Sequence, residues 1–64
     1  MENFSKNIKT RRTQLHLTQK QVASLCGISE RQYIRYETGS QEPSLSIAYT
    51  LAQALQTTLD ELCR

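Results

Sequence analysis

The chain has 64 residues and a formal net charge of +2. A chain this short buries only about 60% of its unfolded surface, which leaves little room for a deep catalytic cleft. It has no apolar stretch long enough for a signal peptide or a membrane span, and its two cysteines neither suit a disulfide framework nor show metal-ligand spacing. We therefore expect one small domain, residues 1–64, in a reducing cytoplasm, without metal or cofactor.

The charge is unevenly distributed along the chain. Residues 6–35 hold seven basic residues and one acid, whereas residues 36–64 hold four acids and one arginine. A basic half of this kind suits a polyanionic partner, with an attraction that weakens in salt. A solvated charged face is the alternative interpretation.

The first predicted helix covers residues 3–15. Phe4, Ile8 and Leu15 share one face at helical spacing. Arg11 falls inside this apolar stripe and Arg12 at its edge, where an arginine can lay its stem along apolar surface and keep its head group wet or paired. The single histidine, His16, is expected in the loop after this helix. No second metal ligand or nucleophile accompanies it.

Two helix-start signals follow within Leu17–Gly39. Thr18 and Ser29 each suit an N-cap, and each has a glutamine, Gln21 or Gln32, placed to return to the cap's backbone N–H. Gly27 lies between them and can take the left-handed backbone that ends a helix. The pattern predicts a helix-turn-helix over about residues 18–38, with helices at about 19–26 and 30–38, whose second helix can lie in a DNA major groove.

The first helix of this pair offers a core and a docking point. Its core candidates are Val22, Ala23, Leu25 and Cys26. Gln19 and Lys20 open the helix, where backbone N–H groups and the helix dipole favour an anion such as a DNA phosphate. The alternative for Gln19 is an exposed polar residue in a first turn. We expect phosphate contacts also from the end of the next helix and the loop after it, at Thr38 and Ser40.

The second helix of the pair has two different sides. At about 100° per residue, Tyr33, Tyr36 and Glu37 cluster on one side. The other side carries Arg31, Ile34, Arg35 and Thr38, with Glu30 at its margin. Arginine can bind guanine O6 and N7, and an aliphatic side chain can contact a thymine methyl group. Glu30 can accept from a cytosine amino group or simply favour the helix start. We therefore predict base contacts from Glu30, Arg31, Ile34 and Arg35, against the alternative of a solvated face.

Two further helices complete the chain. Ser44 caps the fourth, with Pro43 outside it, and the predicted apolar stripe is Leu45, Ala48, Leu51, Ala52 and Leu55. Ile47 and Tyr49 lie off this stripe. Residues 58–61 form another capping-box pattern that opens a last short helix containing Leu59 and Leu62.

Several segments, in this order and spacing, resemble the Cro/C1-type (XRE-like) helix-turn-helix family, which includes lambdoid phage repressors. The resemblance extends from about Ile8 to Leu62. It is carried by Leu17-Thr18-Gln19, Gly27-Ile28-Ser29, Tyr36-Glu37-Thr38-Gly39, Pro43-Ser44-Leu45 and Leu59-Asp60-Glu61-Leu62. The family implies an all-α fold, a compact five-helix lambda-repressor-like DNA-binding domain, usually dimeric on a partly palindromic operator.

The resemblance also implies roles for single residues. It places Gln19 on the DNA backbone and Glu30, Arg31 and Arg35 on bases. It further implies a structural ion pair between Arg12 and Glu37. The chain departs from the family at Tyr33 and Tyr36, where aliphatic residues are usual, and at Arg11, where leucine is common.

Together these observations predict a sequence-specific regulator of transcription that binds double-stranded DNA, a repressor acting as a homodimer. We expect the dimer surface at Leu59, Leu62 and Cys63, with exposed parts of the fourth helix. The alternative is a protein-binding module of the same fold, such as an antitoxin. An enzyme is disfavoured by the single histidine, cysteines without a base and the absence of a carboxylate pair with an evident cleft.

Overall fold

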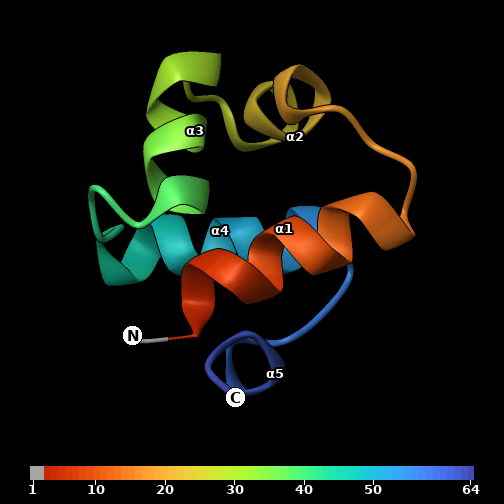
Figure 1. Cartoon of the computed structure of the whole chain (residues 1–64), viewed down its shortest axis with the longest axis vertical. Coiled ribbons are helices and arrows are strands. Elements are labelled where there is room, and N and C mark those ends of the chain that lie inside the picture. The colour runs from red at the N-terminus through yellow and green to blue at the C-terminus, as the bar shows by residue number, and fades with distance from the viewer. Residues whose placement is uncertain (1–2) are drawn as a thin grey trace.

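The computed structural model describes residues 3–64. These residues form five helices and no strand, as the sequence predicts: α1 (Phe4–Gln14), α2 (Gln19–Cys26), α3 (Glu30–Thr38), α4 (Leu45–Ala54) and α5 (Leu59–Leu62). In Figure 1, α2 and α3 occupy the upper part of the molecule and α5 the lower part, with α1 and α4 between them. The predicted all-α class and five-helix arrangement are confirmed.

One hydrophobic core joins all five helices. Two tyrosines of α3, Tyr33 and Tyr36, are part of this core and are almost completely buried. The core residues are Phe4, Ile8, Val22, Ala23, Tyr33, Tyr36, Ala48, Leu51, Ala52, Leu55 and Leu62. The core therefore holds α2 and α3 in a fixed relation to the rest of the chain.

Two predicted core residues are wrong. Leu25 is 61% exposed and Leu45 is 77% exposed. The inward side of α2 is centred on Val22, Ala23 and Cys26, and at about 100° per residue Leu25 falls roughly a quarter turn away from it. Leu45 is the first residue of α4, one turn before the first buried residue of that helix, Ala48, so its side chain lies at the exposed end of the apolar stripe.

The helix starts depend on side-chain caps. The predicted capping box of α2 is confirmed: the Thr18 hydroxyl accepts from the Gln21 N–H at 3.0 Å, and the Gln21 side chain accepts from the Thr18 N–H at 2.8 Å. Ser29 caps α3 by accepting from the Gln32 N–H. The Gln32 side chain, however, does not return to the cap as predicted. It donates to the Tyr36 hydroxyl at 2.7 Å, because that phenol lies one turn further along the same helix.

The turn between α2 and α3 needs Gly27. This residue adopts the left-handed conformation, with φ 70°, which only glycine takes at little cost. Its N–H bonds the Ser24 carbonyl, and the next N–H, of Ile28, bonds the Ala23 carbonyl. These bonds satisfy the last carbonyls of α2 and turn the chain directly into α3.

Polar side chains of α1 fasten the C-terminal part of the chain. Arg11 donates from Nε to the Leu55 carbonyl at 2.8 Å and from Nη2 to the Gln56 carbonyl at 3.0 Å. Asn7 donates to the Leu62 carbonyl at 2.9 Å. Arg11, the arginine within the apolar stripe of α1, therefore has a clear role: it donates to two carbonyls just after the end of α4, where no further turn of helix supplies a donor.

Candidate nucleic-acid interface

The two sides of α3 differ as the sequence predicts. Tyr33, Tyr36 and Glu37 are buried. On the opposite side Arg31, Arg35 and Thr38 are exposed and Ile34 is half-buried, with Glu30 exposed at the start of the helix. The helix therefore presents an outer surface, Arg31–Ile34–Arg35, that we call the α3 outer face.

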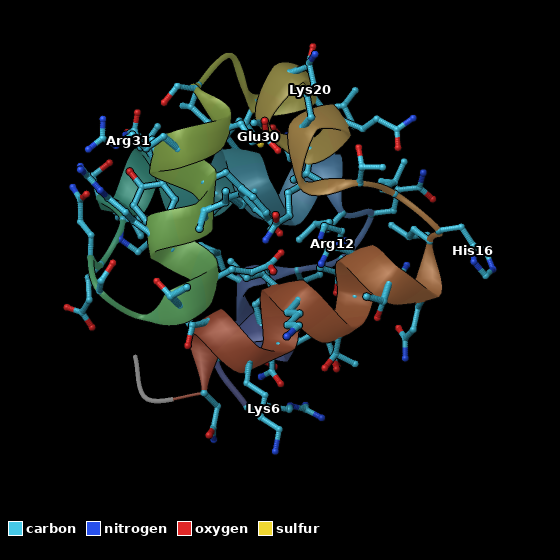
Figure 2. The ribbon with its side chains drawn as sticks, turned by 45° about the horizontal axis from the view of Figure 1, so that its top comes forward. Lys6, Arg12, His16, Lys20, Glu30 and Arg31 are labelled. Atoms are coloured by element: carbon cyan, nitrogen blue, oxygen red, sulfur yellow. The ribbon has the colours of Figure 1, made fainter. Side chains whose placement is uncertain are left out.

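Both arginines of the α3 outer face carry unneutralised charge. Among residues 3–64, every ion pair involves Arg12 or Arg64, and neither Arg31 nor Arg35 takes part in one. Figure 2 shows Arg31 pointing away from the helices. Two free guanidinium groups one turn apart, with an aliphatic side chain between them, suit the donor, acceptor and methyl pattern of a DNA major groove.

The start of α2 lies beside this surface in the helix-turn-helix. Lys20 is exposed and points into solvent in Figure 2. Gln19 is half-buried, and its Nε2 donates to Glu37 Oε1 at 3.2 Å. Its amide thus uses one N–H internally and keeps a second N–H for an outside acceptor.

The hydroxyls at the end of α3 are already engaged. Thr38 donates to the Arg35 carbonyl at 3.2 Å, and Ser40 reaches the same carbonyl at 3.4 Å. Both side chains are exposed. A phosphate accepts hydrogen bonds only, so either hydroxyl has to turn away from the Arg35 carbonyl to bind one.

The Arg12–Glu37 ion pair implied by the family resemblance is present. Arg12 Nε lies 2.6 Å from Glu37 Oε2, and Arg12 Nη2 donates to Oε1 at 3.3 Å. Arg12 Nη1 also donates to the Leu17 carbonyl at 2.8 Å. The side chains are only 13% and 3% exposed, and Figure 2 shows Arg12 pointing in among the helices. The pair thus ties α1, the loop before α2 and α3 together.

The surroundings of Glu37 keep it charged. Burial alone would raise the pKa of Glu37, but hydrogen bonds, above all from Arg12, outweigh burial and lower this pKa below its ordinary value. The Tyr33 hydroxyl is buried next to the carboxylate without a hydrogen bond of good geometry. Burial, reinforced by the Glu37 charge, raises the pKa of Tyr33 far above its ordinary value, so the phenol stays protonated.

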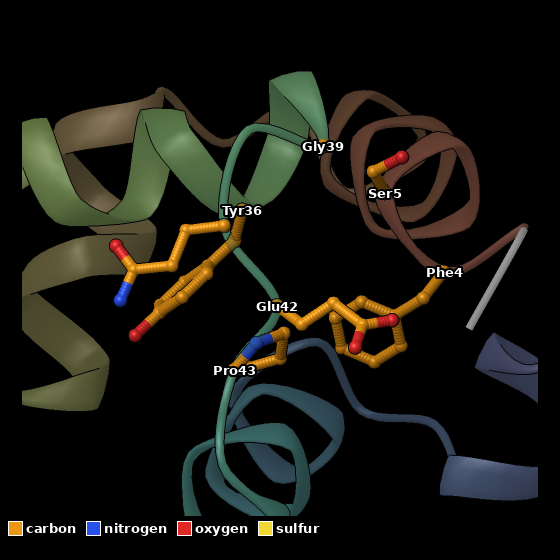
Figure 3. Close-up of a pocket in the computed structure, with 7 residues that line it drawn as sticks. Phe4, Ser5, Tyr36, Gly39, Glu42 and Pro43 are labelled. Atoms are coloured by element: carbon orange, nitrogen blue, oxygen red, sulfur yellow. The ribbon is translucent and has the colours of Figure 1, made fainter.

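Other features of the described chain lie apart from the α3 outer face. A pocket of about 340 Å³ between the start of α1 and the α3–α4 loop is lined by Phe4, Ser5, Tyr36, Gly39, Gln41, Glu42 and Pro43 (Figure 3). No group of three His, Cys, Asp or Glu residues suited to a metal ion occurs in residues 3–64. None of the helices in this part of the chain has the length and apolar character needed to cross a membrane.

One residue of the predicted dimer surface is wrong. Leu62 is only 2% exposed, because α5 packs this side chain into the core. Leu59 is half-buried and Cys63 is exposed. The large exposed apolar side chains of α4 are instead Leu45 and Tyr49, which lie one turn apart.

Comparison with protein families identifies the family to which this arrangement of helices belongs. The family model described as helix-turn-helix matches residues 8–62, which include α2, the turn at Gly27 and α3. The chain belongs to the Cro/C1-type helix-turn-helix family. Membership agrees with the exposed α3 outer face and with the buried Arg12–Glu37 pair.

Named members of the helix-turn-helix family resemble the chain over nearly its whole length. It is 38% identical to the uncharacterized HTH-type transcriptional regulator YqaE of Bacillus subtilis (strain 168), over 95% of this chain and 53% of that protein. It is 34% identical to the cryptic phage CTXphi transcriptional repressor RstR of Vibrio cholerae, over 94% of this chain and 54% of that protein. The chain thus spans about half the length of the curated relatives it matches.

A solved structure shows the same fold. The DNA-binding domain of the P22 C2 repressor, determined by nuclear magnetic resonance, superposes with a TM-score of 0.90 at 27% identity. The match covers 94% of this chain and 79% of that domain. All five helices described above therefore belong to a repressor-type arrangement.

Proposed function

We propose that the chain is a sequence-specific DNA-binding module of a transcriptional repressor, which reads the major groove of double-stranded DNA with α3. The observation that carries the proposal is the α3 outer face, where two unpaired arginines flank Ile34 on the second helix of a helix-turn-helix. Its relatives named above are a regulator and a repressor. They give the protein-binding alternative no support.

The proposal assigns base contacts to four residues. Arg31 and Arg35 each bind a guanine through O6 and N7, and Ile34 contacts a thymine methyl group. Glu30 accepts from a cytosine amino group at the start of α3. All four side chains lie on the exposed or half-exposed part of α3, which supports the assignment.

Phosphate contacts set the docking of the module. Lys20 supplies an exposed charge at the start of α2, and Gln19 supplies its second amide N–H. Thr38 and Ser40 bind phosphates at the C-terminal end of α3, after their hydroxyls turn away from the Arg35 carbonyl. Such contacts fix the register of the protein without reading sequence.

We further propose a homodimer on a partly palindromic operator, with two copies of α3 about 34 Å apart in successive major grooves. Leu59, Cys63 and the exposed side chains Leu45 and Tyr49 of α4 supply its surface. Sedimentation with a duplex of two half-sites tests the dimer, and we expect two protomers per duplex. A one-protomer complex that persists in excess protein would contradict it.

A cytoplasmic, non-enzymatic role completes the proposal. The two cysteines are free thiols, as suits a reducing compartment. Burial raises the pKa of Cys26, which makes its thiol a poor nucleophile. The single histidine, His16, is exposed in the loop after α1, outside the helices that carry the proposed DNA contacts.

Selection of bound duplexes from a random pool tests sequence-specific binding directly. We expect enrichment of a short half-site containing G·C pairs and a thymine, repeated with two-fold symmetry. Titration of the selected operator and of a scrambled duplex then gives the specificity ratio. A pool that stays random after repeated rounds would overturn the proposed function.

A further inference from the structure

We infer that Glu37 is a positioning residue for DNA docking, because it holds the Gln19 amide in the orientation that a phosphate requires. The inference rests on the proposed function, in which Gln19 contacts the DNA backbone. It gives Glu37 a second role, separate from its ion pair with Arg12.

Glu37 is a shared acceptor for two helices. Its Oε1 accepts from Gln19 Nε2 at 3.2 Å and from Arg12 Nη2 at 3.3 Å, and its Oε2 lies 2.6 Å from Arg12 Nε. Arg12 therefore grips both carboxylate oxygens, in the fork geometry that guanidinium and carboxylate groups favour. The carboxylate is only 3% exposed, so it offers Gln19 a fixed point.

A fixed carboxylate determines which way the Gln19 amide faces. An ionised carboxylate only accepts hydrogen bonds, and a glutamine amide has two N–H donors on one end and an oxygen on the other. The amide nitrogen must therefore face Glu37, and a flipped amide would set two oxygens against each other. The pKa of Glu37 lies below its ordinary value, which keeps this acceptor charged near neutral pH.

The orientation matters for phosphate binding. Gln19 is the first residue of α2 and is half-buried. With one N–H on Glu37, the other N–H is left for an acceptor outside the protein. A flexible glutamine loses side-chain freedom when it binds a phosphate, whereas this one has lost that freedom beforehand. Glu37 thus raises affinity without touching DNA.

A double-mutant cycle separates this role from the structural one. The variants are Glu37→Gln, Gln19→Ala and the double variant, titrated against operator and scrambled duplex at a temperature where circular dichroism shows all of them folded. We expect each single change to lower both affinities about fivefold, the equivalent of roughly one hydrogen bond. Adding Glu37→Gln to Gln19→Ala should lower affinity no further, although it should still lower the melting temperature.

The control is Gln14→Ala, which removes an exposed amide at the end of α1 and should change neither affinity nor melting temperature. If Glu37→Gln lowers affinity equally in both backgrounds, Glu37 acts through the fold alone and the inference is wrong. Gln19→Ala with full affinity would also overturn it. A wild-type protein that binds operator and scrambled duplex equally would instead overturn the proposed function.

Nuclear magnetic resonance of the wild-type protein tests the same point without relying on a variant that folds. The Gln19 side-chain amide proton that is bonded to Glu37 should exchange with solvent more slowly in the free protein than the amide protons of the exposed Gln14 side chain. Operator should move chiefly the other proton. Gln19 amide protons that both exchange as fast as those of Gln14 would contradict the inference.

Discussion

Arg12 and Glu37 are far less exposed than the partners of any other ion pair in residues 3–64. Their side chains are 13% and 3% exposed, whereas those of Arg64 and Asp60 are 70% and 82% exposed. Removing one partner of a buried pair leaves an uncompensated charge, while an exposed pair contributes little. At the scale of single residues, therefore, burial determines which ion pair contributes most to stability.

We predict that Arg12→Ala lowers the free energy of unfolding by about 3 kcal/mol, which for a domain of this size lowers the melting temperature by roughly 12 °C or more. The matched control is Arg64→Ala, which breaks only exposed pairs and should change the melting temperature little. Thermal unfolding followed by circular dichroism measures both. Equal melting temperatures for Arg12→Ala and wild type would contradict the stabilising role of the pair.

The same pair makes stability depend on pH. Because the folded-state pKa of Glu37 is below its ordinary value of 4.5, the stabilisation is fully present above that value and is lost as the pH falls through the lower, folded-state pKa. We expect the unfolding free energy of wild type to fall between about pH 5 and pH 2 more steeply than that of Glu37→Gln. Urea unfolding at several pH values measures this, and parallel curves would contradict it.

Residue partners were the least predictable feature. Gln32 fits a capping box by its spacing, yet it donates to Tyr36, since the choice between two acceptors depends on where a neighbouring ring packs. The position of Gln19 at a helix start predicts an exposed docking residue. In the structure its side chain also donates to Glu37, which lies 18 positions further along the chain. Spacing identifies what a side chain can reach locally and says nothing of an acceptor brought in by another helix.

Whole elements were predicted far better. The bounds of α2 and α3 agree with the sequence prediction because Thr18, Ser29, Gly27 and Gly39 act on their own nearest turns. The helical pattern did not predict that Leu25 and Leu45 are exposed, because exposure depends on which neighbouring helix covers each face. The hydrogen bonds of Arg11 could not be predicted from the sequence either, since its carbonyl partners lie more than 40 positions away along the chain.

The turn between α2 and α3 allows a clean test at this scale. Gly27 has φ 70°, and a Cβ added there would meet nothing within 4 Å. Gly27→Ala should therefore lower stability by about 1–2 kcal/mol through backbone strain alone. Gly27→Asn should lose less, since asparagine tolerates the left-handed conformation better. Denaturant unfolding compares the two, and an alanine variant as stable as wild type would contradict the strain.

For the whole molecule bound to DNA, losing a phosphate contact and losing a base contact should change affinity in different ways. Arg35→Ala should cost about 1–3 kcal/mol on the operator and much less on a scrambled duplex, because it removes a base contact. Lys20→Ala should weaken both duplexes alike and reduce the slope of log affinity against log salt by about one unit, because it removes a phosphate contact. Titrations of both duplexes at several salt concentrations measure this. A uniform loss for Arg35→Ala would show that Arg35 does not read a base.

Hydrogen bonds from the Asn3 and Asn7 side chains bring the two ends of the described chain together. The Asn3 side chain donates to the Arg64 carbonyl at 2.9 Å across 61 positions, and in Figure 1 α5 lies on the opposite side of the molecule from α2. The backbone path is thus nearly a closed ring. A short linker from residue 64 to residue 3 would complete the ring and permit circular permutation with new ends in an exposed loop. A reporter domain fused at either residue would hang from the α5 side and leave the start of α2 clear.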